Sequence, residues 1–266
     1  MFGTRRGVVA LAGAALVLGV LAIVVLVSAG RSAPRAARQA RVASDQRLTA
    51  QEIGRRYRRA VVEIVAAVPG GLATGSRPDG SRVRSRGLGF AISGDGLILT
   101  SAALVDHNGH IAKTAEVTFR TAAGTTKRAV GAIACVDPVT GLAVIRVSRA
   151  AISGLEPLPM GDSSGLRAGE AVVALGVPPA APALAAGSVT ATNLALAATY
   201  GVTVSGALLT TASVGRLGSG APLLDMSGRV IAVMEQPNVQ GSGSAALWSA
   251  APINGAAHVI SDANNA

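Results

Sequence analysis

An uninterrupted apolar run near the start of the chain differs from everything that follows it. Residues 7–30 contain no charged side chain. A helix of that length, at about 1.5 Å per residue, reaches about 36 Å and spans a hydrocarbon core of about 30 Å. The pattern predicts a transmembrane helix. A cleaved signal peptide is the alternative, because Arg5 and Arg6 resemble its basic region and 27–29 its cleavage site, although the run is longer than usual.

After the first 60 residues, the hydrophobic pattern becomes a series of short β-prone runs separated by glycine-rich turns. Before them, Thr49 and Glu52 predict the capped start of a helix that begins near residue 48 and leads into a strand at 61–65. Glycine and proline predict a loop over residues 69–86. The later runs are 89–92, 97–100, 115–120, 127–135, 143–147, 171–175, 188–193, 206–210, 222–224, 230–234 and 245–249. With few helical patterns among them, these runs predict an all-β barrel or sandwich.

Charge changes this picture only locally. The formal net charge is +10, but residues 31–86 hold thirteen arginines against four acidic residues, whereas residues 87–266 carry a net charge of −1. Aromatic residues make up 2% of the chain, so few rings are available for base stacking. We therefore expect no nucleic-acid binding by the folded domain.

Cysteine and histidine are too sparse for metal chemistry. Cys135 is the only cysteine, and the three histidines are scattered along the chain. Neither a disulfide nor a set of metal ligands is predicted, and we expect no structural metal and no cofactor.

Residues 31–47 are rich in arginine, alanine and serine, and predict a solvated stalk beside the membrane. Arg31, Arg35, Arg38 and Arg41 recur at spacings of four, three and three. On one helical face they could contact anionic lipid headgroups, each contributing about 1 kcal/mol. The alternative is a self-repelling spacer with no lipid contact.

A serine flanked by glycines is the first candidate for chemistry. Ser219 lies in the run GSGAPL, residues 218–223, immediately before a predicted strand. A nucleophilic serine needs small neighbours, so that its hydroxyl is exposed and backbone N–H groups can point at a developing oxyanion. Alone, such a run is more often a simple turn.

The surrounding segments make this run informative. It resembles the G-N-S-G-G-P-L run of trypsin-like serine proteases of the HtrA/Deg type, and other segments similar to that family follow its order. They are YRRAVVEI at 57–64, GLGFAIS at 87–93, DGLILT at 95–100, DPVTGLAVI at 137–145, MGDSSGLRAGE at 160–170 and AAPI at 250–253. The resemblance covers about residues 50–260. It implies two antiparallel six-stranded β-barrels of the chymotrypsin type.

The same resemblance indicates which catalytic side chains are missing. Ala103 stands where the family has its histidine base, and Gly141 stands where it has the orienting aspartate. Only Ser219 of the triad remains. The implied oxyanion-hole positions are Leu217, Gly218 and Ser219, and Leu217 replaces a glycine, so its Cβ restricts the backbone there.

No other histidine is a good substitute for the base. His107 and His110 lie beyond the turn that would present it, and His258 is near the C-terminus, so we interpret all three as surface or structural residues. Asp106 and Asp137 match non-catalytic positions of the family pattern and are interpreted as turn residues.

We therefore expect a protease homologue that is catalytically inactive and acts as a binding or regulatory module, with a polypeptide held in the cleft between the barrels by strand addition. One alternative is a serine endopeptidase with residual or rerouted activity through Ser219. Another is an electrostatic tether to lipid or nucleic acid through residues 31–59.

These features divide the chain into four segments. We expect a tail and transmembrane anchor at 1–30, the stalk at 31–47, an entry helix and N-terminal barrel at 48–153, and a C-terminal barrel at 154–266. The arginine-rich flank favours a cytoplasmic domain, whereas the resemblance implies a domain outside the cytoplasmic membrane. We expect a single-pass protein of the cell membrane with an extracytoplasmic domain.

Overall fold

The computed structural model describes residues 47–69, 82–107, 109–121, 123–152, 155–178, 183–197, 203–238 and 247–265. The chain divides into two units, residues 1–47 and 48–266, and every element below belongs to the second. The predicted transmembrane helix at 7–30 and the stalk arginines up to Arg41 lie outside the described residues. Within the described ranges, no helix is long and apolar enough to cross a membrane.

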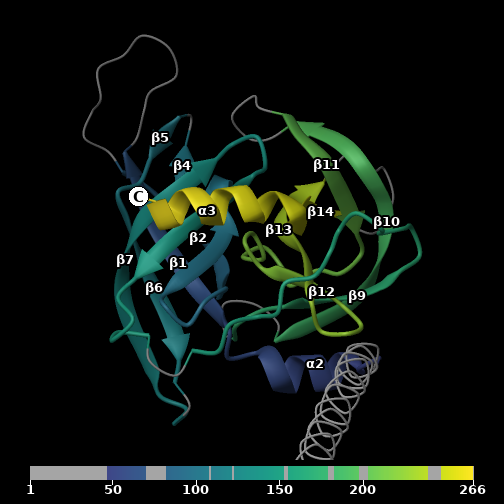
Figure 1. Ribbon diagram of the computed structural model, residues 1–266, viewed down its shortest axis with the longest axis horizontal. Helices are drawn as coiled ribbons and strands as arrows, with labels where there is room; N and C mark the ends of the chain where they lie inside the picture. Colours follow the sequence, from purple (N-terminus) through teal and green to yellow (C-terminus); the bar gives the residue numbers. More distant parts are fainter. Residues whose placement is uncertain are drawn as a thin grey trace, which may run out of the picture. The chain divides into compact units, whose positions relative to one another are not determined.

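Six antiparallel strands close the first barrel in the order β1-β2-β3-β8-β7-β6 (Figure 1). A small hairpin, β4 and β5, lies between β3 and β6 in the sequence. The bounds are β1 Val61–Pro69, β2 Arg82–Ala91, β3 Leu97–Ser101, β4 Asp106–His107, β5 His110–Ile111, β6 Thr114–Arg120, β7 Thr126–Asp137 and β8 Leu142–Val147.

A second closed barrel follows, in the order β10-β11-β14-β13-β12-β9. Its strands are β9 Ala171–Leu175, β10 Leu184–Ala197, β11 Thr203–Thr210, β12 Pro222–Asp225, β13 Val230–Asn238 and β14 Leu247–Pro252. The prediction of an all-β fold with two six-stranded antiparallel barrels is confirmed. The predicted loop at 69–86 begins where β1 ends, at Pro69, but it extends too far, because residues 82–86 belong to β2 and pair with β1.

Short helices flank the strands. Helix α2 (Ala50–Tyr57) begins with the predicted capping box, in which Thr49 Oγ1 accepts from the Glu52 N–H and the Glu52 carboxylate accepts from the Thr49 N–H. Turns of 3₁₀ helix, η1 (Ala102–Leu104) and η2 (Ile253–Gly255), follow β3 and β14. The sequence pattern did not predict α3 (Ala256–Asn265), the C-terminal helix.

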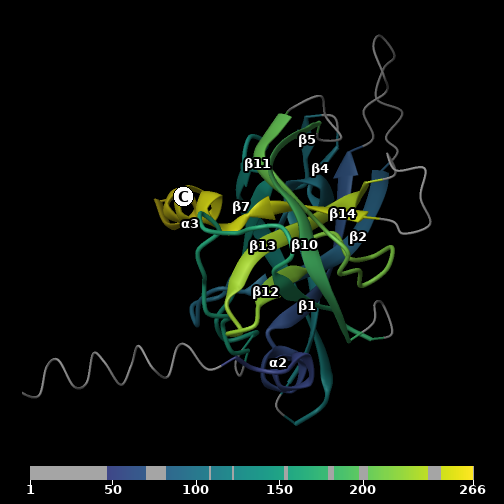
Figure 2. The same cartoon turned by 90° about the vertical axis from the view of Figure 1, so that its right-hand side faces the viewer.

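Each terminal helix packs against the barrel at the other end of the chain. Helix α2 contacts β9 and β10 of the second barrel, where Gly54 lies against Leu184. Helix α3 packs on β7 and β8 of the first barrel, where Arg146 donates to the Ala263 carbonyl. Figure 2 shows the two helices at separate places on the outside of the barrels.

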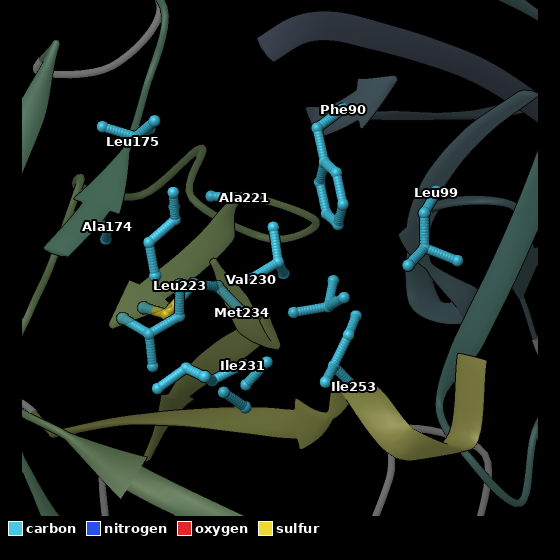
Figure 3. Close-up of a cluster of buried hydrophobic side chains, with 14 of the residues drawn as sticks. Phe90, Leu99, Ala174, Leu175, Ala221, Leu223, Val230, Ile231, Met234 and Ile253 are labelled. Carbon is cyan, nitrogen blue, oxygen red and sulfur yellow. The ribbon is translucent and has the colours of Figure 1, made fainter. Parts of the chain in front are cut away.

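The burial pattern of β3 explains how the barrels are held together. All five of its residues are buried, although a barrel strand ordinarily alternates between interior and exterior. Ile98 belongs to the core of the first barrel, whereas Leu97 and Leu99 belong to a cluster shared with the second. The side chains on the outer face of β3 therefore pack into the core that lies between the two barrels, and Figure 3 shows Leu99 there.

Candidate active site

Ser219 lies in a tight turn before β12 that is attached to both barrels. Its carbonyl accepts from the Leu88 N–H of β2 at 2.8 Å, and the next N–H, of Gly220, donates to the Met234 carbonyl of β13 at 2.7 Å. Gly220 has φ +83°, and a Cβ there would lie 1.9 Å from the Leu88 carbonyl oxygen. Only glycine can occupy this position, because both the backbone conformation and the space exclude a side chain.

The hydroxyl of Ser219 is buried without a partner. The residue is half-buried, but its Oγ is inaccessible to solvent and forms no hydrogen bond with any described residue. A triad serine instead gives its proton to a histidine within hydrogen-bond reach.

Ala103 stands in η1, directly after β3. Ser101 caps this turn, and its Oγ accepts from the Ala103 N–H at 3.2 Å. The Ala102 N–H donates to the Gly141 carbonyl at 2.8 Å, so the positions implied for base and aspartate are neighbours. Ala103 is half-buried, and its methyl group has no atom that could accept a proton.

The three histidines lie elsewhere. His107 and His110 are register partners in the β4-β5 hairpin. His258, on α3, is paired with Asp262 at 3.2 Å and is exposed. Asp106 lies in β4 and Asp137 is the last residue of β7, and each accepts a backbone N–H group from the turn that follows it, from Gly109 and Val139 respectively.

A carboxyl group from the second barrel lies at the position implied for the aspartate. Gly141 has φ +75°, and a Cβ built on it would lie 3.3 Å from Glu235 Oε1. Glu235 belongs to β13, and its Oε2 accepts from Ser101 Oγ at 2.6 Å. The Glu235 side chain therefore occupies space that a side chain at 141 would need.

The environment of Glu235 keeps its carboxyl group neutral near pH 7. Burial raises its pKa to about 8, and the hydrogen bond from Ser101 only partly opposes this effect. Its Oε1 is inaccessible and has no hydrogen-bond partner in the described part of the chain. Glu235 Oε1 and Ser219 Oγ are thus two unsatisfied buried polar atoms in one region, and each costs about 1–3 kcal/mol.

The positions implied for the oxyanion hole form the turn before Ser219. Gly218 donates its N–H to the Gly215 carbonyl at 2.9 Å, so this donor is already used. Asn193 is the only non-glycine residue with a positive φ in the described part of the chain, so the φ of Leu217 is not positive. The positive φ values of this segment fall on Gly215 and Gly220, on either side of Leu217.

An indole ring fills the space beside this turn. Trp248 of β14 is 3% exposed. A Cβ on Gly218 would lie 3.2 Å from Trp248 Cη2 and 2.9 Å from Val214 Cγ2. A substrate side chain that reached Ser219 from this side would have to displace the indole.

No described cluster of histidine, cysteine, aspartate or glutamate has the composition of a metal site. The candidate site consists of the predicted residues Ser219, Ala103 and Gly141. The structure adds Glu235 and Ser101, which the sequence did not indicate.

A two-barrel fold with this serine turn defines the class of protein. The family model of the trypsin-like peptidase domain matches residues 87–233, and the chain belongs to this family. Within it, the chain is a homologue of the HtrA-type serine proteases.

The sequence relatives agree with this assignment. Serine protease HTRA2, mitochondrial, of Bos taurus is 33% identical over 151 residues, which are 56% of this chain and 31% of that protein. Serine protease PepD of Mycobacterium tuberculosis is 31% identical over 209 residues, 69% of this chain and 42% of that protein. The chain therefore spans about a third to two-fifths of the length of these relatives.

Two solved structures show the same fold. The HtrA-type protease AlgW with decapeptide superposes with a TM-score of 0.63 at 21% identity, covering 82% of this chain and 68% of that one. Deg5 gives a TM-score of 0.57 at 24% identity, covering 78% and 90%.

Sequence reasoning missed Glu235 and Trp248. One signal for Glu235 was available, because it is a single acid directly after the apolar run 230–234. Trp248 is the only tryptophan of the chain, but nothing local to it indicates that it packs against residue 218, thirty residues earlier.

Proposed function

We propose that this protein is a catalytically inactive HtrA-type protease homologue that binds extended polypeptides between its two barrels without hydrolysing them. The observation that carries the proposal is the serine itself. Its hydroxyl is buried without a partner, and the residue at the base position is Ala103.

The chemistry of the serine supports inactivity. A neutral serine hydroxyl is a weak nucleophile, and it attacks a peptide carbonyl only when a base removes its proton. Loss of the triad from a comparable hydrolase costs about 10⁶-fold in rate, or about 8.5 kcal/mol of barrier. No other described residue hydrogen-bonds to Ser219 Oγ and could replace the base.

The indole of Trp248 supports the same conclusion. It packs against Gly218, so the space beside the serine turn is filled by the protein's own side chain. A polypeptide bound across the barrels would pass over this turn without inserting a side chain beneath it.

Polypeptide binding is supported by the class of protein. The solved structure of AlgW contains a decapeptide. AlgW therefore binds a peptide. For this chain we propose binding by strand addition, in which main-chain hydrogen bonds supply affinity with little dependence on sequence.

We further propose that residues 7–30 anchor the protein in the cell membrane and place the barrels outside the cytoplasm. The absence of charge over 24 residues supports a membrane span. Arg31, Arg35, Arg38 and Arg41, which follow this span, would contact anionic headgroups.

Serine labelling tests the proposed inactivity. The full chain in detergent is treated with a fluorescent phosphonofluoridate, and casein hydrolysis is followed in parallel. We expect neither labelling nor hydrolysis above the level of the Ser219→Ala variant. Labelling of the wild type that disappears in Ser219→Ala would instead establish the endopeptidase alternative.

Polypeptide binding is measured separately. Reduced, unfolded casein labelled with a fluorophore is titrated with the full chain, and its anisotropy is recorded. We expect saturable binding, with the casein recovered intact. Absence of binding would refute the proposed function even if the protein is inactive.

A further inference from the structure

We propose that Arg58, Arg59 and Arg120 bind the phosphoryl group of a small phosphate ester or of a phospholipid headgroup. These three side chains line a pocket of about 240 Å³, and none of the described residues that line it with them is acidic. The described lining also includes no residue of the candidate active site. The proposed site therefore does not depend on the proposed function.

The turn between α2 and β1 fixes the backbone of two of these arginines. Arg58 is the C-cap of α2, and within the turn the Ala60 N–H donates to the Tyr57 carbonyl at 2.9 Å. Val61, the next residue, is buried at the start of β1. The backbone that carries Arg58 and Arg59 is therefore held at both ends.

Strand pairing brings the third arginine to this turn. Strands β1 and β6 pair antiparallel, and continuing their register to the end of β6 places Arg120 opposite Val61. The turn after β6 is closed by the Thr121 N–H, which donates to the Thr125 carbonyl at 2.8 Å. Because Val61 closely follows Arg59 in the chain, Arg120 meets the turn that carries the other two arginines.

The second barrel provides the remaining wall of the pocket. Gly176, Val177 and Pro178 follow β9, and Ala183 precedes β10. The Gly176 N–H donates to the Ala183 carbonyl at 3.1 Å and closes the base of this connection. This wall is apolar and suits the carbon skeleton of an ester. At about 240 Å³, the pocket is smaller than sites for drug-sized ligands, which have about 300–1,000 Å³, so it suits a small group.

The positive charges of this pocket have no carboxylate partner in the described part of the chain. Arg58, Arg59 and Arg120 are exposed, and none of them forms an ion pair there. Arg59 also borders another pocket, which Arg56 and Glu156 help to line, but it is not paired with Glu156. Like charges repel one another, so an anion bound among the three guanidinium groups would stabilise this arrangement.

Another arginine-lined pocket, on the first barrel, is neutralised by the protein itself. Its charged lining consists of three arginines and two glutamates, Arg84, Arg86, Arg128, Glu63 and Glu116. Arg86 is paired with Glu63 at 2.5 Å, and Arg128 with Glu116 at 3.5 Å. The pocket beside α2 has no such acids in its described wall, so a ligand would have to supply the negative charge.

The chemistry of guanidinium groups selects a phosphoryl group. A phosphate monoester carries a charge of about −1.5 to −2 at pH 7 and three strong acceptor oxygens. Guanidinium presents five N–H donors in a planar fork that binds phosphate oxygens in pairs. A carboxylate has a single charge and two oxygens, so it would leave more of the charge of three arginines unbalanced.

Protection of the arginines from chemical modification is the first test. The full chain in non-ionic detergent is treated with phenylglyoxal, which modifies guanidinium groups, with and without glycerol 3-phosphate. Peptide mass spectrometry identifies the modified positions. We expect the phosphate ester to protect Arg58, Arg59 and Arg120. Arg55 is exposed on α2 outside this pocket and should stay reactive, and equal protection of all four arginines would overturn the proposal.

Reconstitution distinguishes the two sources of the phosphoryl group. The full chain is placed in phosphatidylcholine vesicles with or without phosphatidic acid, and the modification is repeated. Protection by glycerol 3-phosphate assigns a soluble ester, whereas protection of the same arginines that requires phosphatidic acid assigns a headgroup. If neither probe protects them, the proposal is wrong.

Variants measure the contribution of one arginine to the affinity for the probe that protects. We expect Arg120→Gln to bind about 10- to 100-fold more weakly, because hydrogen bonds to a charged group are lost. Arg120→Lys keeps the charge but not the planar fork, and should lie between this variant and the wild type. Arg55→Gln removes the same charge from α2 and should change the affinity less than about twofold. An effect of Arg55→Gln as large as that of Arg120→Gln would contradict a defined site.

Discussion

At the scale of single residues, the candidate site combines positions that the motifs identify with a side chain that only the structure reveals. Ala103 and Gly141 can be identified from the motifs, because each lies inside a recognisable run. Glu235 is an addition, and its partner Ser101 is 134 positions away in the other barrel. No local pattern can predict such a pair, since the contact exists only after both barrels have formed and packed.

The carboxyl group of Glu235 predicts a pH dependence of stability. Its pKa is raised from 4.5 to about 8 in the folded state, so the folded protein binds the proton more tightly than the unfolded chain. Its contribution to stability is fully present below about pH 4.5, falls as the pH rises and is lost above about pH 8. The total loss is several kcal/mol, at about 1.4 kcal/mol for each unit of pKa shift.

Glu235→Gln removes this dependence. The amide keeps an acceptor for Ser101 but does not titrate, so we expect the variant to gain stability relative to the wild type as the pH rises from 5 to 8. Urea unfolding at several pH values measures the difference. A constant difference over this range would show that the carboxyl group is not buried as described.

At position 220 even the smallest side chain, a methyl group, should strongly destabilise the folded protein. Gly220→Ala places a Cβ against the Leu88 carbonyl at a positive φ, and we expect it to lower the free energy of unfolding by about 2–4 kcal/mol. Gly165→Ala is the matched control, because nothing lies within 4 Å of its added Cβ. That control should change stability by less than about 0.5 kcal/mol, and similar effects of the two substitutions would contradict the packing.

At the scale of elements, the strands were more predictable than the helices. Runs such as 171–175 and 143–147 are β-branched or apolar and short, and they became β9 and most of β8. Helix α3 was missed, because its buried residues Ala256, Val259 and Ala263 are small and lie among polar ones. Its burial depends on β7 and β8, which are remote in sequence.

The capping box of α2 was predicted from two residues, and it can be tested in the same terms. Thr49→Ala removes the acceptor for the Glu52 N–H, and we expect a loss of about 1 kcal/mol. Thr49→Ser keeps the oxygen and should retain most of the stability. Chemical denaturation compares the two variants, and equal losses would mean that the methyl group of Thr49, not its oxygen, is what matters.

At the scale of the whole molecule, the two barrels share one core. Phe90 and Leu99 of the first barrel belong to the same buried cluster as Ala221 and Val230 of the second. In Figure 3 the Phe90 ring lies between Leu99 on one side and Ala221 on the other. The crossed packing of α2 and α3 adds a second connection. We therefore expect the barrels to unfold together.

Trp248 makes this expectation measurable. It is the only tryptophan and lies in the second barrel, so its fluorescence reports that barrel, whereas far-ultraviolet circular dichroism reports both. Phe90→Ala, in the first barrel, should lower the free energy of unfolding by about 3–5 kcal/mol and shift both signals equally. Val130→Ala, at a site that is 69% exposed, serves as the control. If Phe90→Ala leaves the unfolding transition seen by Trp248 fluorescence unchanged, the two barrels unfold independently.

The attachment of the serine turn bears on how such a protein can arise. Leu88, Met234 and the restricted space at Gly220 fix this turn for reasons of architecture alone. If the protein is inactive as proposed, Gly220 would persist after the base and the aspartate were replaced, because a side chain at Gly220 would collide with the Leu88 carbonyl of the other barrel. The backbone around the serine would then be conserved for the packing of the barrels, whether or not the serine is used in catalysis.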